Sequence, residues 1–120
     1  FDRDKAFADL SRVVHEPAFE KRSPDEKTAF YAALGATGLP GALAFLSQIL
    51  AARPTLLNKK KVLEDKLLAV AGLAAASSIH AIKLLQGVLE DKAQPPELLV
   101  AARKALYQTR KALFGESAEA

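Results

Sequence analysis

The sequence contains no cysteine, no methionine and no tryptophan, and it has only two histidines. Without cysteine, disulfides and thiolate metal sites are excluded, and the cellular compartment is left open. No apolar run approaches the ~20 residues that a bilayer-spanning helix needs, and no signal-peptide pattern opens the chain. We therefore expect no membrane insertion and take a cytoplasmic location as the default. Because the chain opens at Phe1 rather than at methionine, we expect it to be a piece of a longer protein.

The residues that are present favour helix over strand. Half of them are hydrophobic, and alanine and leucine supply most of this half, whereas valine, isoleucine and threonine are sparse. A length of 120 residues fits one domain with a buried core. We assign residues 1–115 to this all-α domain and residues 116–120 to a tail.

The chain also repeats itself. Residues 25–50 align without a gap on residues 64–89, thirty-nine positions later, and apolar positions fall on apolar positions. A period in this range is typical of stacked supersecondary units, each too small to bury its own apolar face. Matches at shorter spacing extend the repeat to both sides, from residues 6–14 to 42–50 and from residues 69–73 to 102–106.

Helix start and stop signals divide the chain into six expected helices. Ser23 can cap a helix that opens at Pro24, with Glu26 placed for a capping box, and Gly38 and Gly115 mark helix ends. The expected helices span about residues 4–15, 24–37, 40–53, 61–76, 79–90 and 95–114. They form three hairpins at about residues 3–38, 40–76 and 79–114. Small residues in the second helices of the first two hairpins permit close helix approach.

In its repeat period and helix pattern, the chain resembles HEAT-repeat proteins along nearly its whole length. In that family the first helix of a unit often opens with proline and spaced leucines, as at Pro40, Leu43 and Leu46. The second helix carries a basic residue, an alanine and a leucine, and the second unit matches with Lys66, Ala69 and Leu73.

The other two units match this pattern in part. Phe30 replaces the alanine between Lys27 and Leu34, and Leu99 replaces the basic residue before Ala102 and Leu106. The family's aspartate within the repeat turn has no clean counterpart, and the connector at residues 53–60 is longer than usual. The resemblance implies an α-solenoid that acts as a scaffold or adaptor for a protein partner.

The sequence shows no constellation for catalysis or for a cofactor. His15 and His80 are far apart and belong to no metal-binding pair. Carboxylate pairs at residues 25–26 and 64–65 recur at expected helix starts, where negative charge is favourable for the helix dipole. The glycine cluster at residues 35–41 lacks the lysine of a phosphate-binding loop. We expect a protein that is not an enzyme and that has no metal and no cofactor.

Charge is unevenly spread, and a lysine cluster is the first candidate binding site. The net charge is +3, and residues 27–66 carry most of the excess of bases. Lys59, Lys60 and Lys61 lie at an expected helix start, where positive charge is unfavourable for the helix dipole. We expect these lysines to steer an acidic or amphipathic partner electrostatically.

The second candidate is a face of the last helix that carries Arg103, Tyr107 and Arg110. Arginine and tyrosine are residue types that anchor interfaces, and we expect these three to anchor the partner. The alternative interpretation is that these three residues simply lie on the solvated outer face of a terminal helix and bind no partner. Lys27 and Lys66, one repeat apart, can form a ligand-binding ladder, but we favour a structural role that links neighbouring units.

Three other functions stay open. Binding of a nucleic-acid backbone through the same basic residues has the modest net charge against it. The chain can also be a docking or accessory domain of a larger multidomain enzyme or signalling protein. Self-association through the solenoid ends is the third, with Phe1, Phe7 and Phe19 as its candidate contacts.

Overall fold

The computed structural model describes residues 2–115, which fold into six α-helices and one short 3-10 helix and contain no strand. The elements are α1 (Arg3–Val14), η1 (Pro17–Lys21), α2 (Pro24–Ala36), α3 (Pro40–Leu50), α4 (Lys59–Ala76), α5 (Ile79–Glu90) and α6 (Pro96–Phe114). The prediction of an all-α fold with six helices is confirmed. The tail at residues 116–120 lies outside the described residues.

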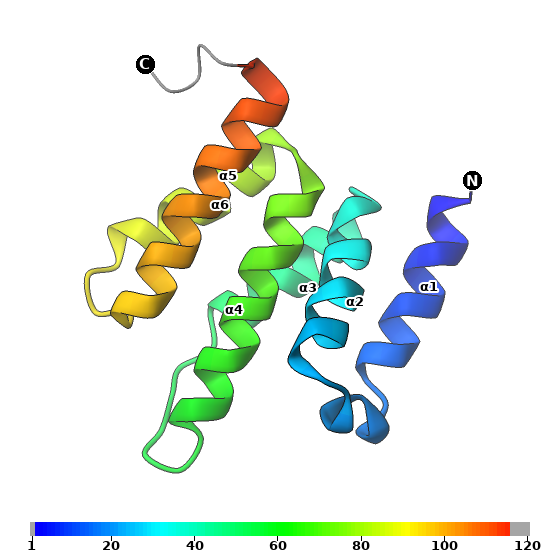
Figure 1. Cartoon of the computed structure of the whole chain (residues 1–120), viewed down its shortest axis with the longest axis horizontal. Coiled ribbons are helices and arrows are strands. Elements are labelled where there is room, and N and C mark those ends of the chain that lie inside the picture. Colours follow the sequence, from blue (N-terminus) through cyan, green and yellow to red (C-terminus); the bar gives the residue numbers. More distant parts are fainter. Residues whose placement is uncertain (1, 116–120) are drawn as a thin grey trace.

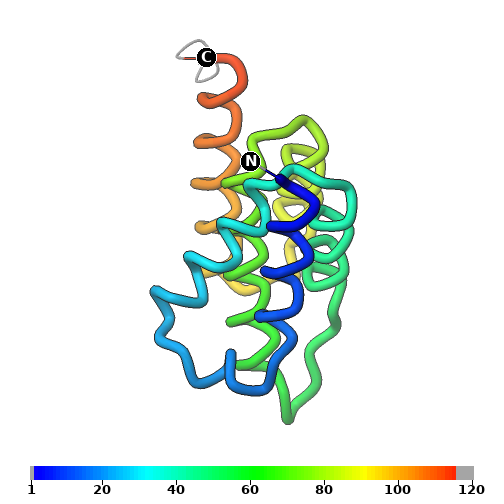
Figure 2. The backbone as a smooth tube through the Cα atoms, turned by 90° about the vertical axis from the view of Figure 1, so that its right-hand side faces the viewer, coloured from blue at the N-terminus to red at the C-terminus, as the bar shows by residue number. Residues whose placement is uncertain are grey.

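The helices form two layers. Figure 1 shows α2, α4 and α6 side by side in front, with α3 and α5 behind them and α1 along the edge next to α2. Seen edge on in Figure 2, the molecule is thin, and its shortest extent of 22 Å is what two helix layers require. Helices that follow each other as hairpins are in contact: α1 with α2, α3 with α4, and α5 with α6.

Local signals explain where several helices begin and end. The Ser23 hydroxyl accepts a hydrogen bond from the Glu26 backbone at 3.2 Å, and the Glu26 carboxylate accepts one from the Ser23 backbone at 3.4 Å. Ser78 caps α5 in the simpler way, by accepting from the Ala81 backbone at 3.0 Å. Gly38, which lies just beyond α2, adopts a φ of 67° that residues with a Cβ rarely tolerate.

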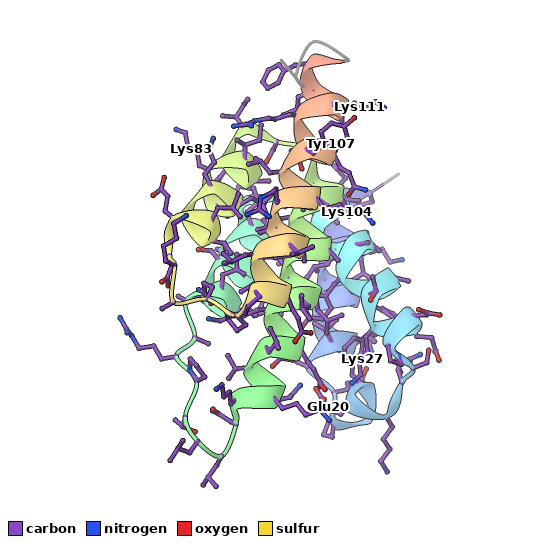
Figure 3. The ribbon with its side chains drawn as sticks, turned by 60° about the vertical axis from the view of Figure 1, so that its left-hand side comes forward. Glu20, Lys27, Lys83, Lys104, Tyr107 and Lys111 are labelled. Atoms are coloured by element: carbon purple, nitrogen blue, oxygen red, sulfur yellow. The ribbon has the colours of Figure 1, made fainter. Side chains whose placement is uncertain are left out.

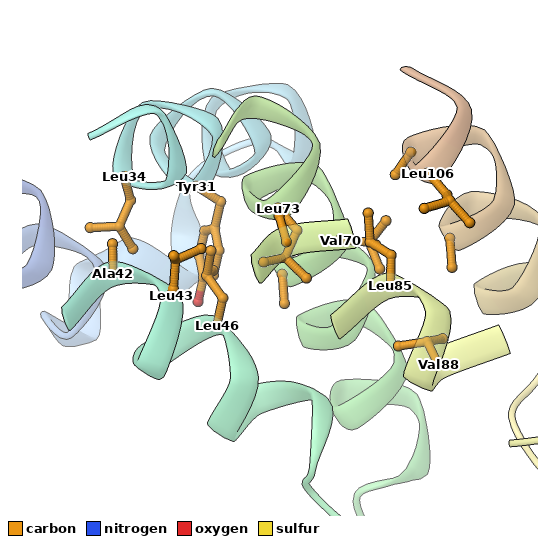
Figure 4. Close-up of a cluster of buried hydrophobic side chains, with 14 of the residues drawn as sticks. Tyr31, Leu34, Ala42, Leu43, Leu46, Val70, Leu73, Leu85, Val88 and Leu106 are labelled. Atoms are coloured by element: carbon orange, nitrogen blue, oxygen red, sulfur yellow. The ribbon is translucent and has the colours of Figure 1, made fainter. Parts of the chain in front are cut away.

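The core runs between the two layers and follows the sequence repeat. Leu34 and Leu73, which the repeat aligns, are both fully buried, and so are the aligned Leu46 and Leu85. Figure 4 shows these side chains as one continuous cluster that extends from α2 and α3 to α5 and α6. Each buried leucine stabilises the fold by about 1.5–3 kcal/mol, so the aligned positions account for much of the stability.

Helices α2 and α4 approach so closely that their backbones touch. A Cβ on Gly35 would lie 1.8 Å from the carbonyl oxygen of Gly72, which no real side chain tolerates. The expectation that small residues permit close approach of the second helices is therefore confirmed at this crossing.

The 3-10 helix η1 was not expected from the sequence, and it changes the role of one phenylalanine. Phe19 is 3% exposed, with its ring edge-on to Phe30 at 5.7 Å and 6.0 Å from the Tyr31 ring. The assignment of Phe19 to a self-association surface is wrong, because this side chain belongs to the core. Phe7 is partly buried against the same core, and Phe1 lies outside the described residues.

Candidate partner-binding surfaces

The outer face of α6 is basic and partly apolar. No Asp or Glu occurs from Leu98 to Gly115, whereas the helix carries four basic residues. Arg103 is exposed, Tyr107 is 43% exposed and Arg110 is half-buried. Figure 3 shows Lys104, Tyr107 and Lys111 following one another along this face. The predicted anchors thus share one helix face, and Lys104 and Val100 are exposed beside them.

The lysine cluster lies at the opposite end of the same layer. Helices α4 and α6 run in the same direction, so the first turn of α4 is remote from the second half of α6 (Figure 1). The structure therefore does not bring Lys59, Lys60 and Lys61 into one patch with Arg110. Lys59 and Lys60 are exposed, but Lys61 is engaged in ion pairs.

Lys61 joins α4 to the 3-10 helix η1. Its Nζ lies 2.7 Å from the Glu20 carboxylate and 2.8 Å from that of Asp65 in the next turn. The hydrogen bond from Lys61 holds the pKa of Glu20 below its ordinary value of 4.5. Partial burial opposes the charge on Lys61, yet its bonds to Asp65 and Glu20 raise the pKa of this lysine above 10.5. These ion pairs supply the structural reason for a cation at this helix start, which sequence reasoning lacked.

Lys27 ends in the same ion-pair network. Its Nζ lies 3.6 Å from the second oxygen of Glu20, and its side chain is 17% exposed. Glu20 therefore bridges Lys27 of α2 and Lys61 of α4. This contact agrees with the structural role that we favoured for Lys27.

Lys66, the repeat equivalent of Lys27, has a different environment. The residue is 5% exposed, and its Nζ donates a hydrogen bond to the Gln94 side-chain oxygen at 3.3 Å. Among the described residues, no carboxylate forms an ion pair with it. Burial lowers the pKa of Lys66, and the nearby Arg53 acts in the same direction while Asp91 opposes it. The hydrogen bond to Gln94 connects α4 to the connector before α6, so Lys66 links neighbouring hairpins. It does so through a neutral amide and not through an ion pair.

Beside Lys66 lies an open groove of about 1090 Å³. The groove lies between the α3–α4 connector (residues 51–58), the first turns of α4 and the α5–α6 connector (residues 91–95). Its lining includes Arg53, Lys59 and Lys60, together with several apolar side chains. Lys59 and Lys60 were candidates from the sequence, but the groove itself depends on three separate segments.

Two leucines in the α3–α4 connector are fully exposed. Leu56 and Leu57 each have 100% of their surface in contact with solvent, and both line the groove. The connector is closed locally by Asn58, whose side-chain oxygen accepts hydrogen bonds from the backbone and hydroxyl of Thr55 at 2.6 and 2.9 Å. An adjacent pair of leucines in water is unusual for a folded domain and marks a candidate contact surface.

The histidines have structural surroundings. His15 ends α1, where its Nδ1 lies 2.6 Å from the Ser11 carbonyl oxygen and its ring packs against Phe45 at 5.1 Å. His80 is exposed in the first turn of α5. Within residues 2–115, no three histidine or carboxylate side chains gather where they could hold a metal ion.

Comparison of the chain with known proteins found no match. No family model matches it, and no curated protein or solved structure is significantly similar. In the part of the chain that the structure describes, no helix is long and apolar enough to cross a membrane.

Proposed function

We propose that this chain is a non-catalytic helical-repeat module that binds an acidic or amphipathic protein partner. The three helix pairs are then units of a HEAT-like solenoid, and α2, α4 and α6 form the surface that such modules present. Support for this arrangement comes from the thirty-nine-residue repeat and from the contacts of α4 with both α2 and α6.

The observation that carries the proposal is the outer face of α6. This helix presents arginine and lysine side chains beside exposed Val100, Tyr107 and Phe114, with no acidic residue from Leu98 to Gly115. Interfaces are enriched in Arg and Tyr, and a positive patch favours encounter with a negative one. In this proposal Arg103, Tyr107 and Arg110 anchor the partner, and the exposed Lys59 and Lys60 increase the association rate from a distance.

Affinity capture from a native lysate tests this function with paired charge reversals. The variant R103E/R110E changes the α6 face, whereas K5E/K83E makes the same change in net charge on α1 and α5. Lys5, Lys83 and Arg103 are exposed and Arg110 is half-buried, so circular dichroism of both variants verifies that each is folded. We expect a partner that is retained by wild type and by K5E/K83E but lost from R103E/R110E, as quantified by mass spectrometry.

Two results would contradict the proposal. Equal capture by R103E/R110E and wild type would remove α6 from the interface. Capture that disappears after nuclease treatment, with steep loss between low and moderate salt, would instead assign the basic residues to a nucleic-acid backbone.

A further inference from the structure

The groove beside Lys66 continues into a second depression. A smaller depression of about 250 Å³ adjoins it and shares Leu50, Ala51, Asp91 and Gln94 with it. This second depression lies between α3 and α5, so the two together continue from the α3–α4 connector across the end of both helices. A ligand that occupies both depressions contacts α3, α4, α5 and the two connectors together, as an extended peptide segment can.

Part of the groove wall is apolar and exposed to solvent. Leu56 and Leu57 are fully exposed in the connector, and Val62 and Leu63 of α4 line the groove near them. Burying one leucine side chain contributes about 1.5–3 kcal/mol, so a ligand that covers this pair gains a substantial part of its binding free energy there.

Lys66, which is buried among the lining residues, forms no ion pair with a carboxylate of the described residues. An ammonium group has three donors, and its one hydrogen bond to a side chain reaches the neutral amide of Gln94 at 3.3 Å. Its repeat equivalent Lys27 has the Glu20 carboxylate as a partner at 3.6 Å. A buried cation without a carboxylate is costly, and a ligand that supplies one offsets this cost.

The surrounding charges favour an anionic ligand on one side of the groove. Arg53, Lys59 and Lys60 line it, and no Asp or Glu occurs anywhere from residue 27 to residue 63. The two acidic residues of the lining, Asp91 and Glu97, both belong to the opposite side, at the α5–α6 connector and the start of α6. A ligand carboxylate is therefore attracted to the side formed by α4 and the α3–α4 connector.

We propose that this groove binds an extended peptide segment of a protein partner, in which an acidic side chain is flanked by apolar ones. The carboxylate pairs with the Nζ of Lys66, and the apolar side chains pack on Leu56 and Leu57. Lys59 and Lys60 lie where further acidic residues of the segment can pair. The inference rests on the proposed function for the assumption that the partner is a protein, and it assigns to that partner a second contact remote from α6.

The electrostatics of Lys66 agree with this assignment. Burial lowers the pKa of its ammonium group, the nearby Asp91 opposes this shift in part, and Arg53 lowers the pKa further. A bound carboxylate acts in the opposite direction, so peptide binding raises the pKa of Lys66.

Selection of random peptides displayed on phage tests the inference without the natural partner. Peptides are enriched on the wild-type protein, and the affinity of the best one is measured by fluorescence anisotropy. The key variant is Q94E, which places an internal carboxylate within reach of Lys66 and is expected to fold because it adds an ion pair. K66M removes the cation, and K83E serves as the control on the exposed side of α5.

We expect the enriched peptides to share an acidic residue next to apolar ones. Binding should be about tenfold or more weaker in Q94E and K66M and unchanged in K83E. Substitution of both Leu56 and Leu57 by serine should also weaken binding, and circular dichroism verifies that each variant is folded.

Three outcomes would overturn the inference: no peptide enriched over K66M, enriched peptides without a shared acidic residue, or equal affinity for wild type and Q94E. Vesicles of phosphatidylcholine with phosphatidylserine provide a further control. Binding to these vesicles that requires Leu56 and Leu57 but not Lys66 would assign the connector to a membrane surface instead. Because enrichment is scored against K66M, which keeps the α6 face unchanged, a failure here leaves capture through α6 intact, and the two proposals fail separately.

Discussion

The two sides of α4 differ in how far contacts within the chain cover their apolar surface and pair their charges. On the side of α2, the backbones of Gly35 and Gly72 touch, and Glu20 bridges Lys27 and Lys61. On the side of the α5–α6 connector, the side-chain partner of Lys66 among residues 2–115 is the neutral amide of Gln94, and an open groove separates the connectors. Contacts within the chain thus close one side of the helix. The other side is left with exposed apolar surface and with a lysine that forms no ion pair among the described residues.

This difference separates residues that hold the fold from residues that are available to a partner. The closed side should respond to substitution with a loss of stability, whereas the open side should respond with a loss of binding. Stability measurements on matched variants can therefore test this distinction.

Gly35→Ala should have the largest effect. The new methyl group would overlap the Gly72 carbonyl, so α2 and α4 must separate, and we expect a loss of about 3 kcal/mol in the free energy of unfolding. Urea unfolding followed by circular dichroism measures it. The matched control is Gly87→Ala in α5, where a Cβ meets nothing within 4 Å and should stabilise the helix by about 0.5–1 kcal/mol. Equal stability of both variants would show that α2 and α4 are farther apart than described.

Glu20→Gln should have an intermediate, pH-dependent effect. The folded-state pKa of Glu20 lies below its ordinary value of 4.5, so its stabilisation is present above that pH and is lost as the pH falls through the folded-state pKa. Because the Glu20 side chain is 52% exposed, we expect only about 0.5–1 kcal/mol at pH 7.

Urea unfolding of wild type and E20Q between about pH 7 and pH 3 tests this assignment. The two proteins should differ at neutral pH and converge under acid conditions. Glu90→Gln, at an exposed position in the last turn of α5, is the control and should change the free energy of unfolding at pH 7 by less than about 0.5 kcal/mol. A difference for E20Q that persists at low pH would mean that the ion pairs are not its source.

Lys66→Met should have the smallest effect on stability. Replacing a buried cation by an apolar side chain of similar length is often neutral, and we expect a change of less than about 1 kcal/mol. Thermal unfolding measures this change. A loss of about 3 kcal/mol or more would place Lys66 with the closed side of α4 and would identify its contact with Gln94 as structural.

Local signals made much of the helical pattern predictable. The bounds of α5 agree with the expected residues 79–90, and the Ser23 capping box forms as predicted because its groups lie within one turn. The repeat identified the buried leucines because aligned apolar positions face the same core. By contrast, α3 ends at Leu50 rather than Arg53, and α4 begins at Lys59 rather than Lys61.

Features that depend on distant residues were not predictable. The helix η1 is stabilised by Phe19, which packs on rings of α2, whereas the sequence shows only a proline that ends the preceding helix. Lys61 finds its partner Glu20 at a separation of 41 residues, and Lys66 finds Gln94 at a separation of 28. The groove combines three segments, so the basic residues that line it were visible from the sequence while the site was not.

The contact between Gly35 and Gly72 also has an evolutionary consequence. Every amino acid other than glycine carries a Cβ, and that atom alone is already incompatible with the crossing at Gly35. Any point mutation that replaces Gly35 should therefore destabilise the fold. Neighbouring exposed positions such as Ala33 and Ala36 can change without this cost. Among natural variants of this protein, Gly35 should be lost only together with a change in the spacing of its helices.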